Sequence, residues 1–376
     1  MPNRDRRKMS KVIFDRLTGY ALQNEVVIKD AEKPRWIKRL SDDDAAFMAK
    51  SETFPLILGR NTRALMLTYA DERYYVLQGF SQPIGEIEGF EKCELTPALF
   101  ALAVIELHLV PIASGSEIRD LLEDQYMGVD QYEGHDVGDI QLMFSPLVAY
   151  HVDSDFEFTS DPLRAVGSYV ARTYDNGPLP LSDKTRNSLV RIFETGNRWI
   201  PFQLVLQGIL SFSWASLYLE IYRCIENMYP YARIKKLTEN WPPHSSLRDI
   251  AILLEKELSW RPREEEALAS IIRQCSGAAS QKLLQSFNMQ SDSIVDPSAA
   301  AARLVYATRN ELVHFRPREE TASRDDAIWD RQVCALIDCL EEVYRISGDF
   351  FHELQQVVTS ADVSPRPTVN GVGAAG

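Results

Sequence analysis

An arginine and a histidine near the C-terminal end of the chain have types and a spacing that could do chemistry on a phosphate. Four residues separate Arg309 from His314, and Asn310 follows the arginine directly. A histidine can accept or donate a proton near neutral pH, and an arginine can bind a phosphate and neutralise the charge that develops on it. Arg309, His314 and Asn310 are therefore the first candidate catalytic residues.

A helix is predicted to carry these residues on its last turn and a half. Asp296 is a good N-cap, Pro297 suits the first helical position, and Pro317 prevents continuation beyond about residue 315. The partial negative charge at the C-terminal end of a helix favours the protonated form of a nearby histidine. The predicted placement of His314 therefore suits a proton carrier.

The hydrophobic pattern of this helix separates a core-facing side from an outward side. At 100° per residue, the predicted core stripe comprises Ala301, Leu304, Val305, Thr308, Leu312 and Phe315. The opposite side comprises Tyr306, Asn310, Val313 and His314, with Arg309 on the border. Arg309 and His314 are about 140° apart on an ideal helix, so a single copy of the helix does not easily bring them together.

Residues 175–180, Asp-Asn-Gly-Pro-Leu-Pro, form the clearest boundary in the chain, because a turn-forming segment is combined with two prolines. Everything beyond it is predicted to be helical. The expected helices span residues 182–197, 202–228, 246–259, 262–276, 298–315 and 326–358. Glu226 lies in the second of these helices among apolar residues, so it needs a polar partner and is a fourth candidate for the site.

The first half of the chain alternates strand-like and helix-like segments. A β-hairpin is predicted from residues 65–69 and 74–80, and further strands from residues 140–144 and 147–152. Helices are expected at about residues 97–110 after Thr96, 117–125 after the N-cap Ser116, and 162–174 after Asp161. The predicted fold class is α+β: a mixed α/β domain (1–174), a linker (175–181), an all-α domain (182–360) and a disordered tail (361–376).

Composition and charge restrict the function classes. The 376 residues are 45% hydrophobic and 25% charged, which is typical of a globular protein large enough for two domains. The net charge of −13 is uneven: residues 1–181 have 29 acidic and 19 basic side chains, and residues 182–360 have 24 and 21. An acidic first half is a poor general binder of nucleic acid, so any RNA chemistry must rest on a local site in the second half.

Cysteine usage and hydropathy indicate a cytoplasmic protein. The five cysteines are an odd number without a Cys-x-x-Cys pair, so they predict free thiols in a reducing compartment and no zinc site. The basic start of the chain has no apolar segment behind it, which argues against a signal peptide. Residues 200–219 contain no charge but have too many polar residues for a lipid-facing helix. No membrane span, metal or cofactor is predicted.

The motif and its surroundings resemble the HEPN superfamily of ribonuclease domains, whose pattern is Arg, four to six residues, then His, often with a polar residue after the arginine. Arg309-Asn310-x-x-x-His314 has this pattern, and it is expected by chance in roughly one of fifty chains of this length. The preceding residues 304–308 and the helix that carries Glu226 are similar to the Apea-like subgroup. The resemblance covers about residues 183–358.

The resemblance implies metal-independent endoribonuclease activity, in which a 2′-hydroxyl of the RNA attacks the neighbouring phosphate. HEPN domains pair their motif helices, which implies a homodimer through the Arg309–His314 helix. The family context implies antiphage defence or stress response in bacteria, of the abortive-infection or toxin kind. RNA is then the substrate, and residues 1–174 sense a regulatory protein or a phage-derived trigger.

Each feature also has a plainer interpretation. Arg309 at a surface helix end could simply pair with Glu311 or Glu226, in a HEPN-like module that binds or assembles without cleaving RNA. A second loose match, Arg345 to His352, lies inside the last predicted helix and is taken as a coincidence. Residues 134–139, Gly-His-Asp-Val-Gly-Asp, are predicted to be a flexible acidic loop, because further metal ligands at suitable spacing are missing. A membrane-associated interaction protein is a third class, and it depends on residues 200–219.

Overall fold

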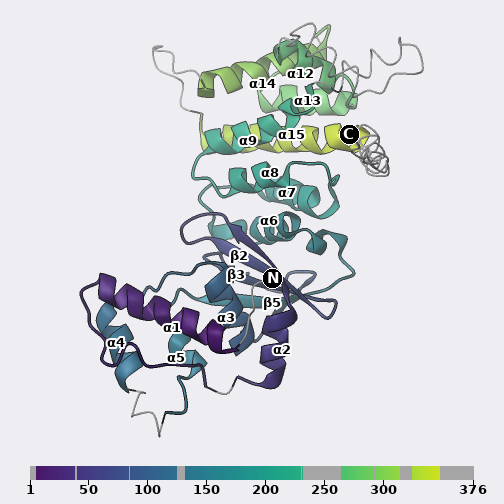
Figure 1. Ribbon diagram of the computed structural model, residues 1–376. Coiled ribbons are helices and arrows are strands. Elements are labelled where there is room, and N and C mark those ends of the chain that lie inside the picture. Colours follow the sequence, from purple (N-terminus) through teal and green to yellow (C-terminus); the bar gives the residue numbers. More distant parts are fainter. Residues whose placement is uncertain are drawn as a thin grey trace, which may run out of the picture. The chain divides into compact units, whose positions relative to one another are not determined.

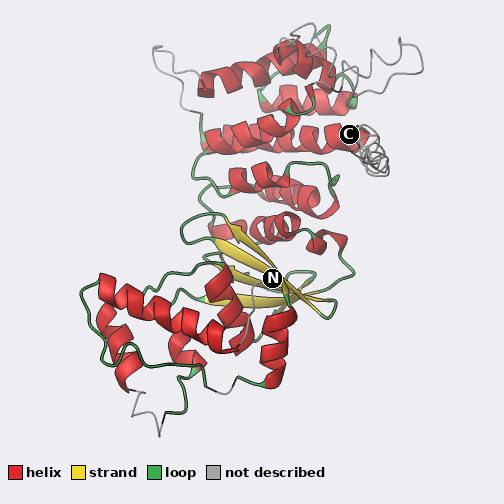
Figure 2. Cartoon of the chain, in the orientation of Figure 1, coloured by secondary structure: helices red, strands yellow, loops and turns green. Residues whose placement is uncertain are grey.

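The computed structural model describes residues 6–38, 40–83, 85–124, 132–229, 231, 264–290, 294–313 and 324–347. The fold class is α+β, as predicted (Figures 1 and 2). The chain divides into two compact units, Met1–Gly177 and Pro178–Gly376. The division falls inside the turn-and-proline segment, and each unit has its own buried core.

The first unit is built on a five-stranded antiparallel sheet. Its strands, in the spatial order β1-β2-β3-β5-β4, are β1 (Glu52–Ile57), β2 (Arg63–Tyr69), β3 (Glu72–Gln78), β5 (Leu147–Val152) and β4 (Phe90–Cys93). The predicted hairpin is confirmed, because β2 pairs directly with β3. Its two loop residues, Ala70 and Asp71, have φ of 51° and 67°, the left-handed conformation that tight hairpin loops require.

Helices cover both faces of this sheet (Figure 1). They are α1 (Arg6–Gln23), α2 (Asp42–Lys50), α3 (Pro97–Glu106), α4 (Gly115–Asp124), α5 (Val137–Gln141) and α6 (Pro162–Arg172), with short 3-10 turns at Glu157–Ser160 and Tyr174–Asn176. Val76 belongs to the core shared with α1 and α3, whereas its neighbour Tyr75 lies on the other face. On that face Tyr150 bonds to Tyr169 of α6 at 3.0 Å between the hydroxyl oxygens. Alternate strand residues thus enter two different cores.

Two local predictions for this unit were wrong. Residues 140–144 are not a strand: they form the last residues of α5 and the turn that follows it. The helix forms here because Asp136 caps it by accepting a hydrogen bond from the Gly138 amide at 2.9 Å. A short apolar run does not distinguish strand from helix. The cap of α4 is Ser114 rather than Ser116, and Glu117 completes the capping box by accepting from the Ser114 amide at 2.7 Å.

Among its described residues the second unit consists of helices and the turns and loops that join them. Its helices are α7 (Asp183–Thr195), α8 (Phe202–Ile209), α9 (Trp214–Glu226), α12 (Glu264–Ile272), α13 (Gly277–Ser286), α14 (Pro297–Val313) and α15 (Asp326–Ile346). Helix α9 is tied to two others by buried tyrosines. The Tyr218 hydroxyl donates to the Val305 carbonyl of α14 at 3.0 Å, and the Tyr344 hydroxyl of α15 donates to the Cys224 carbonyl of α9 at 3.0 Å.

The helix predicted over residues 202–228 is in fact two helices. They are separated at residues 210–213, where Ser213 caps α9 by accepting from the Ser216 amide at 3.1 Å. Helix α13 was not predicted. Ser276 and Gly277 were taken as the end of the preceding helix, but Ser276 is the N-cap of α13 and Gly277 is its first residue. The helix predicted at residues 246–259 lies outside the described residues. No described helix is both long and apolar enough to cross a membrane.

Helices α12 and α14 lie antiparallel and are joined by three ion pairs. Asp296 at the start of α14 pairs with Arg273 at 2.7 Å, and Glu265 pairs with Arg303 at 3.5 Å. The third pair joins Glu264, at the start of α12, to Arg309 near the end of α14, also at 3.5 Å. Helix α12 therefore contacts the candidate catalytic residues, although the sequence did not suggest it.

Candidate functional site

Helix α14 positions Arg309 and Asn310 on its last full turn. Asp296 is the predicted N-cap, and its carboxylate accepts a hydrogen bond from the Ala299 amide at 2.9 Å. The predicted core stripe is partly correct: Ala301, Val305 and Thr308 are buried, and Ala302 is buried as well. Leu304 and Leu312 are only half-buried, and Phe315 lies outside the described residues.

Arg309 turns toward its own helical bundle. Its Nη1 donates to Asn310 Oδ1 at 2.9 Å and lies 3.5 Å from Glu264 Oε2. Its Cζ lies 5.9 Å from the centre of the Tyr222 ring of α9, within range of a cation–π interaction. The Arg309 side chain is 19% exposed, so the guanidinium lies in a seam between α9, α12 and α14 with part of its surface open to solvent.

Glu226 belongs to the same charge cluster. Burial raises the pKa of this carboxyl, and the negative charge of Glu264 raises it further, while Arg309 and Arg223 act in the opposite direction. Burial is the largest of these influences, and a charged carboxylate loses more than a neutral acid does when water is removed from it. Glu226 is therefore the group of this cluster that holds a proton at higher pH than an ordinary glutamate.

The ion pairs expected for a purely structural Arg309 were wrong in detail. Glu311 pairs with Arg324 at 2.7 Å, not with Arg309. Glu226 influences Arg309 through charge, but the ion-pair partner of Arg309 is Glu264. Asn310 accepts a hydrogen bond from Arg309 through its Oδ1, so it helps to orient the arginine next to it.

The two histidines of the motif matches are not described by the structure, whereas Arg345, Val313 and Tyr306 are. His314 and His352 lie outside the described residues. Arg345, the arginine of the second match, is 70% exposed and pairs with Glu342 of its own helix at 3.7 Å. On the proposed dimer face, Val313 is 48% exposed and Tyr306 is half-buried.

Sequence reasoning missed Glu264, Tyr222 and Tyr229. Tyr222, Glu226 and Tyr229 recur at intervals of four and three residues, the spacing of one helix face, and the hydroxyls of the two tyrosines bond to each other. Both rings are buried, and burial raises the pKa of the Tyr222 hydroxyl. This polar line, which begins on α9 and continues just beyond its end, was a usable signal. Glu264 had none, because it is distant in sequence and stands in a run of three glutamates.

The predicted flexible loop at residues 134–139 is ordered. His135 is fully buried, its Nδ1 bonds to the Tyr132 hydroxyl, and burial together with the charge of Arg35 lowers its pKa to about 4. Asp136 caps α5. Both residues thus have structural roles, and no group of three or more potential metal ligands occurs in the described part of the chain.

Glu226→Gln is expected to raise the free energy of unfolding at neutral pH. A raised pKa means that the folded protein binds the proton more tightly than the unfolded chain, so the ionised carboxylate destabilises the fold once the pH exceeds the folded pKa. Below about pH 4, where unfolded glutamates also become protonated, the difference between the two proteins should vanish. Urea unfolding between pH 4 and pH 8 measures this, and a variant less stable than the wild type at pH 7 would contradict the assignment.

Comparison of the chain with family models, with curated proteins and with solved structures gives no match.

Proposed function

We propose that the helical unit is a metal-independent endoribonuclease of the HEPN type, which cleaves RNA through attack of a 2′-hydroxyl on the neighbouring phosphate. One observation carries the proposal. Glu226, chosen as a candidate on a different helix, lies close enough to Arg309 of the motif for the two charges to interact, and Asn310 bonds to the same arginine. The approach of Glu226 to Arg309 supports the proposal, because the two residues were chosen as candidates from different helices.

The roles follow from the chemistry of each group. Arg309 binds the scissile phosphate and offsets the charge of the pentacoordinate species. His314 moves the proton of the 2′-hydroxyl or of the leaving 5′-oxygen. Asn310 fixes the guanidinium through its Oδ1 at 2.9 Å. Glu226 is a second group that can hold a proton beside the phosphate, because its pKa is raised.

A non-catalytic helical module is the second candidate, and the internal partners of Arg309 favour it. The arginine is 19% exposed and already engages Glu264 and Asn310. In this case the cluster stabilises the bundle, and the unit acts in RNA or protein binding or in assembly. The two candidates differ in one result, which is whether the purified protein breaks RNA.

The biological setting is part of the same proposal. RNA cleavage by a HEPN-type unit fits antiphage defence or a stress response of the abortive-infection or toxin kind. The first unit would then sense a regulatory protein or a phage-derived trigger, and it would restrain the nuclease until that trigger arrives. The active form is proposed to be a homodimer, since Arg309 and His314 are about 140° apart on one helix.

The test uses the full chain and two matched substrates. An RNA oligonucleotide should be cut with release of a 2′,3′-cyclic phosphate end, and the same sequence with 2′-deoxyriboses should remain intact, because its nucleophile is missing. Cleavage should continue in EDTA. Equal cleavage of both oligonucleotides, or loss of activity in EDTA, would refute the mechanism. An intact RNA at all protein concentrations, with and without cell extract as a source of a trigger, would favour the second candidate.

A further inference from the structure

Among the residues that the structure describes, the polar partners of the Arg309 guanidinium lie on one side of it. Both of its polar contacts with described residues are made by Nη1, one to Asn310 Oδ1 at 2.9 Å and one to Glu264 Oε2 at 3.5 Å. The Tyr222 ring supports the guanidinium at 5.9 Å. Nε and Nη2, which form the other edge, have no partner among the described residues. An arginine edge with two parallel N–H groups matches two oxygens of a phosphate.

Glu264 is suited to be the anchor of this arrangement. Its side chain is 37% exposed, but its Oε2 is buried, accepts no hydrogen bond from the described residues and lies in an ion pair with Arg309. A carboxylate attracts a guanidinium more strongly than an amide does because it carries a full negative charge, and the burial of its oxygen reduces the screening by water. Asn310 alone lies next to Arg309 on the same helix and moves with it, whereas Glu264 belongs to another helix and fixes the guanidinium relative to the bundle.

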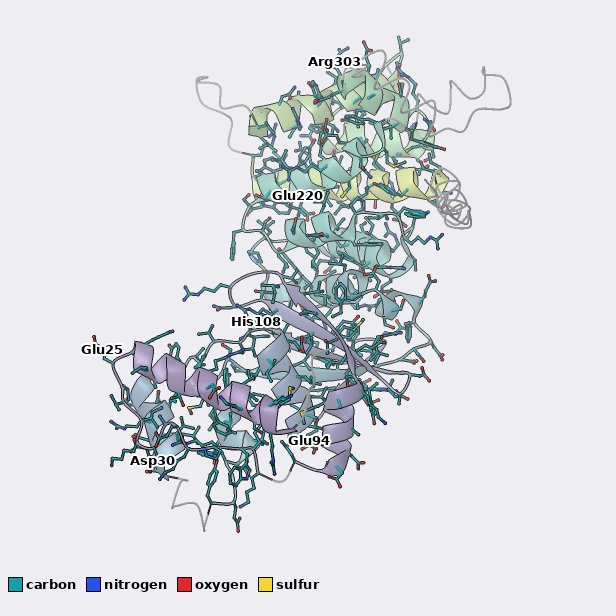
Figure 3. The ribbon with its side chains drawn as sticks, in the orientation of Figure 1. Glu25, Asp30, Glu94, His108, Glu220 and Arg303 are labelled. Carbon is teal, nitrogen blue, oxygen red and sulfur yellow. The ribbon has the colours of Figure 1, made fainter. Side chains whose placement is uncertain are left out.

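A neighbouring ion pair shows what an ordinary contact looks like. Glu265 pairs with Arg303 at the same distance of 3.5 Å, but the Arg303 side chain is 75% exposed and the Glu265 side chain 42% exposed. Figure 3 shows Arg303 at the outer surface of the helices. Such an exposed pair contributes little to stability and nothing to the site. It joins the same two helices, so it serves as a matched control.

We infer that Glu264 is a positioning residue of the nuclease, which holds Arg309 through Nη1 so that Nε and Nη2 face the scissile phosphate. This inference rests on the proposed function. It adds α12 to the active site and assigns a role to a residue that the Arg–His motif does not contain. Glu264 itself takes no proton in the reaction and does not touch the RNA.

Glu264→Gln is therefore expected to lower kcat for RNA cleavage by about tenfold to a hundredfold with little change in KM, since a misoriented arginine is felt most in the transition state. Glu265→Gln should leave both constants unchanged. If Glu264→Gln does not fold, Glu264→Asp takes its place, because it keeps the charge but withdraws the carboxylate by one methylene. Equal kcat values for the Glu264 and Glu265 variants would overturn the inference.

A second measurement does not depend on cleavage. Rotation of the Arg309 guanidinium about the Nε–Cζ bond, measured by arginine side-chain NMR, should be slow in the wild type and in Glu265→Gln and faster in Glu264→Gln. A wild type that cuts no RNA but shows this difference refutes the proposed function and leaves the anchoring contact standing. A wild type that cuts RNA without this difference refutes the anchor alone.

Discussion

Arg309→Ala and His314→Ala are each expected to lower the rate of RNA cleavage by at least about a hundredfold. The first change removes the cation that binds the phosphate, and the second removes the proton carrier. Arg309 also contacts Glu264 and Asn310, so its loss is expected to destabilise the bundle, whereas His314→Ala should not. Thermal unfolding and circular dichroism of each variant therefore accompany the cleavage assay, and Arg309→Lys, which keeps the charge without the fork, separates the two effects.

Two kinds of control make this result specific. Arg303→Ala removes an exposed arginine from the same helix, and cleavage should not change. Arg345→Ala and His352→Ala remove the second loose match and should leave cleavage within a few-fold of the wild type. The assignment of the motif fails if the second pair abolishes cleavage while the changes at Arg309 and His314 are tolerated.

Val313→Glu is expected to convert an active dimer into an inactive monomer. Val313 is 48% exposed and follows Arg309 by one helical turn, on the face proposed to meet its own copy. Across a two-fold axis each new carboxylate would face another, and burying like charges costs on the order of several kcal/mol. The fold should survive, because the buried stripe of α14 is untouched.

Light scattering and the RNA assay on this one variant decide the outcome. Gln285→Glu, which adds the same charge at an exposed position on α13, is the control and should remain dimeric and active. A wild type that is monomeric and fully active would remove the composite two-chain site. A Val313→Glu protein that is still dimeric would show that the dimer uses another surface.

Local signals in the sequence predicted much of the fold. The caps Thr96, Asp161 and Asp296 begin helices as expected, because each side chain satisfies backbone amides that the first turn leaves free. Predictions failed where one signal had two meanings. Ser276 and Gly277 suit both the end of one helix and the start of another, and the apolar run at residues 140–144 suits both strand and helix.

The sequence predicted candidate residues within single helices, but it did not predict the contacts between helices that complete the site. Asn310 could be expected to interact with a neighbour on α14, and Glu226 to need a polar partner. The contact between Glu264 and Arg309 joins residues 45 positions apart, and its existence depends on how α12 packs on α14. Periodicity within a helix carries no information about that packing, so the sequence could not distinguish Glu264 from Glu265 and Glu266.

The three ion pairs between α12 and α14 restrict how this protein can change in evolution. At each pair one helix supplies the acid and the other the base, and the direction reverses along the interface: Glu264 and Glu265 face arginines, whereas Arg273 faces Asp296. A reversal of sign on one helix alone would place like charges together, so descendants should inherit such exchanges in matched pairs. The exposed Arg303 pair is the freest to vary, and Arg309 with Glu264 the least.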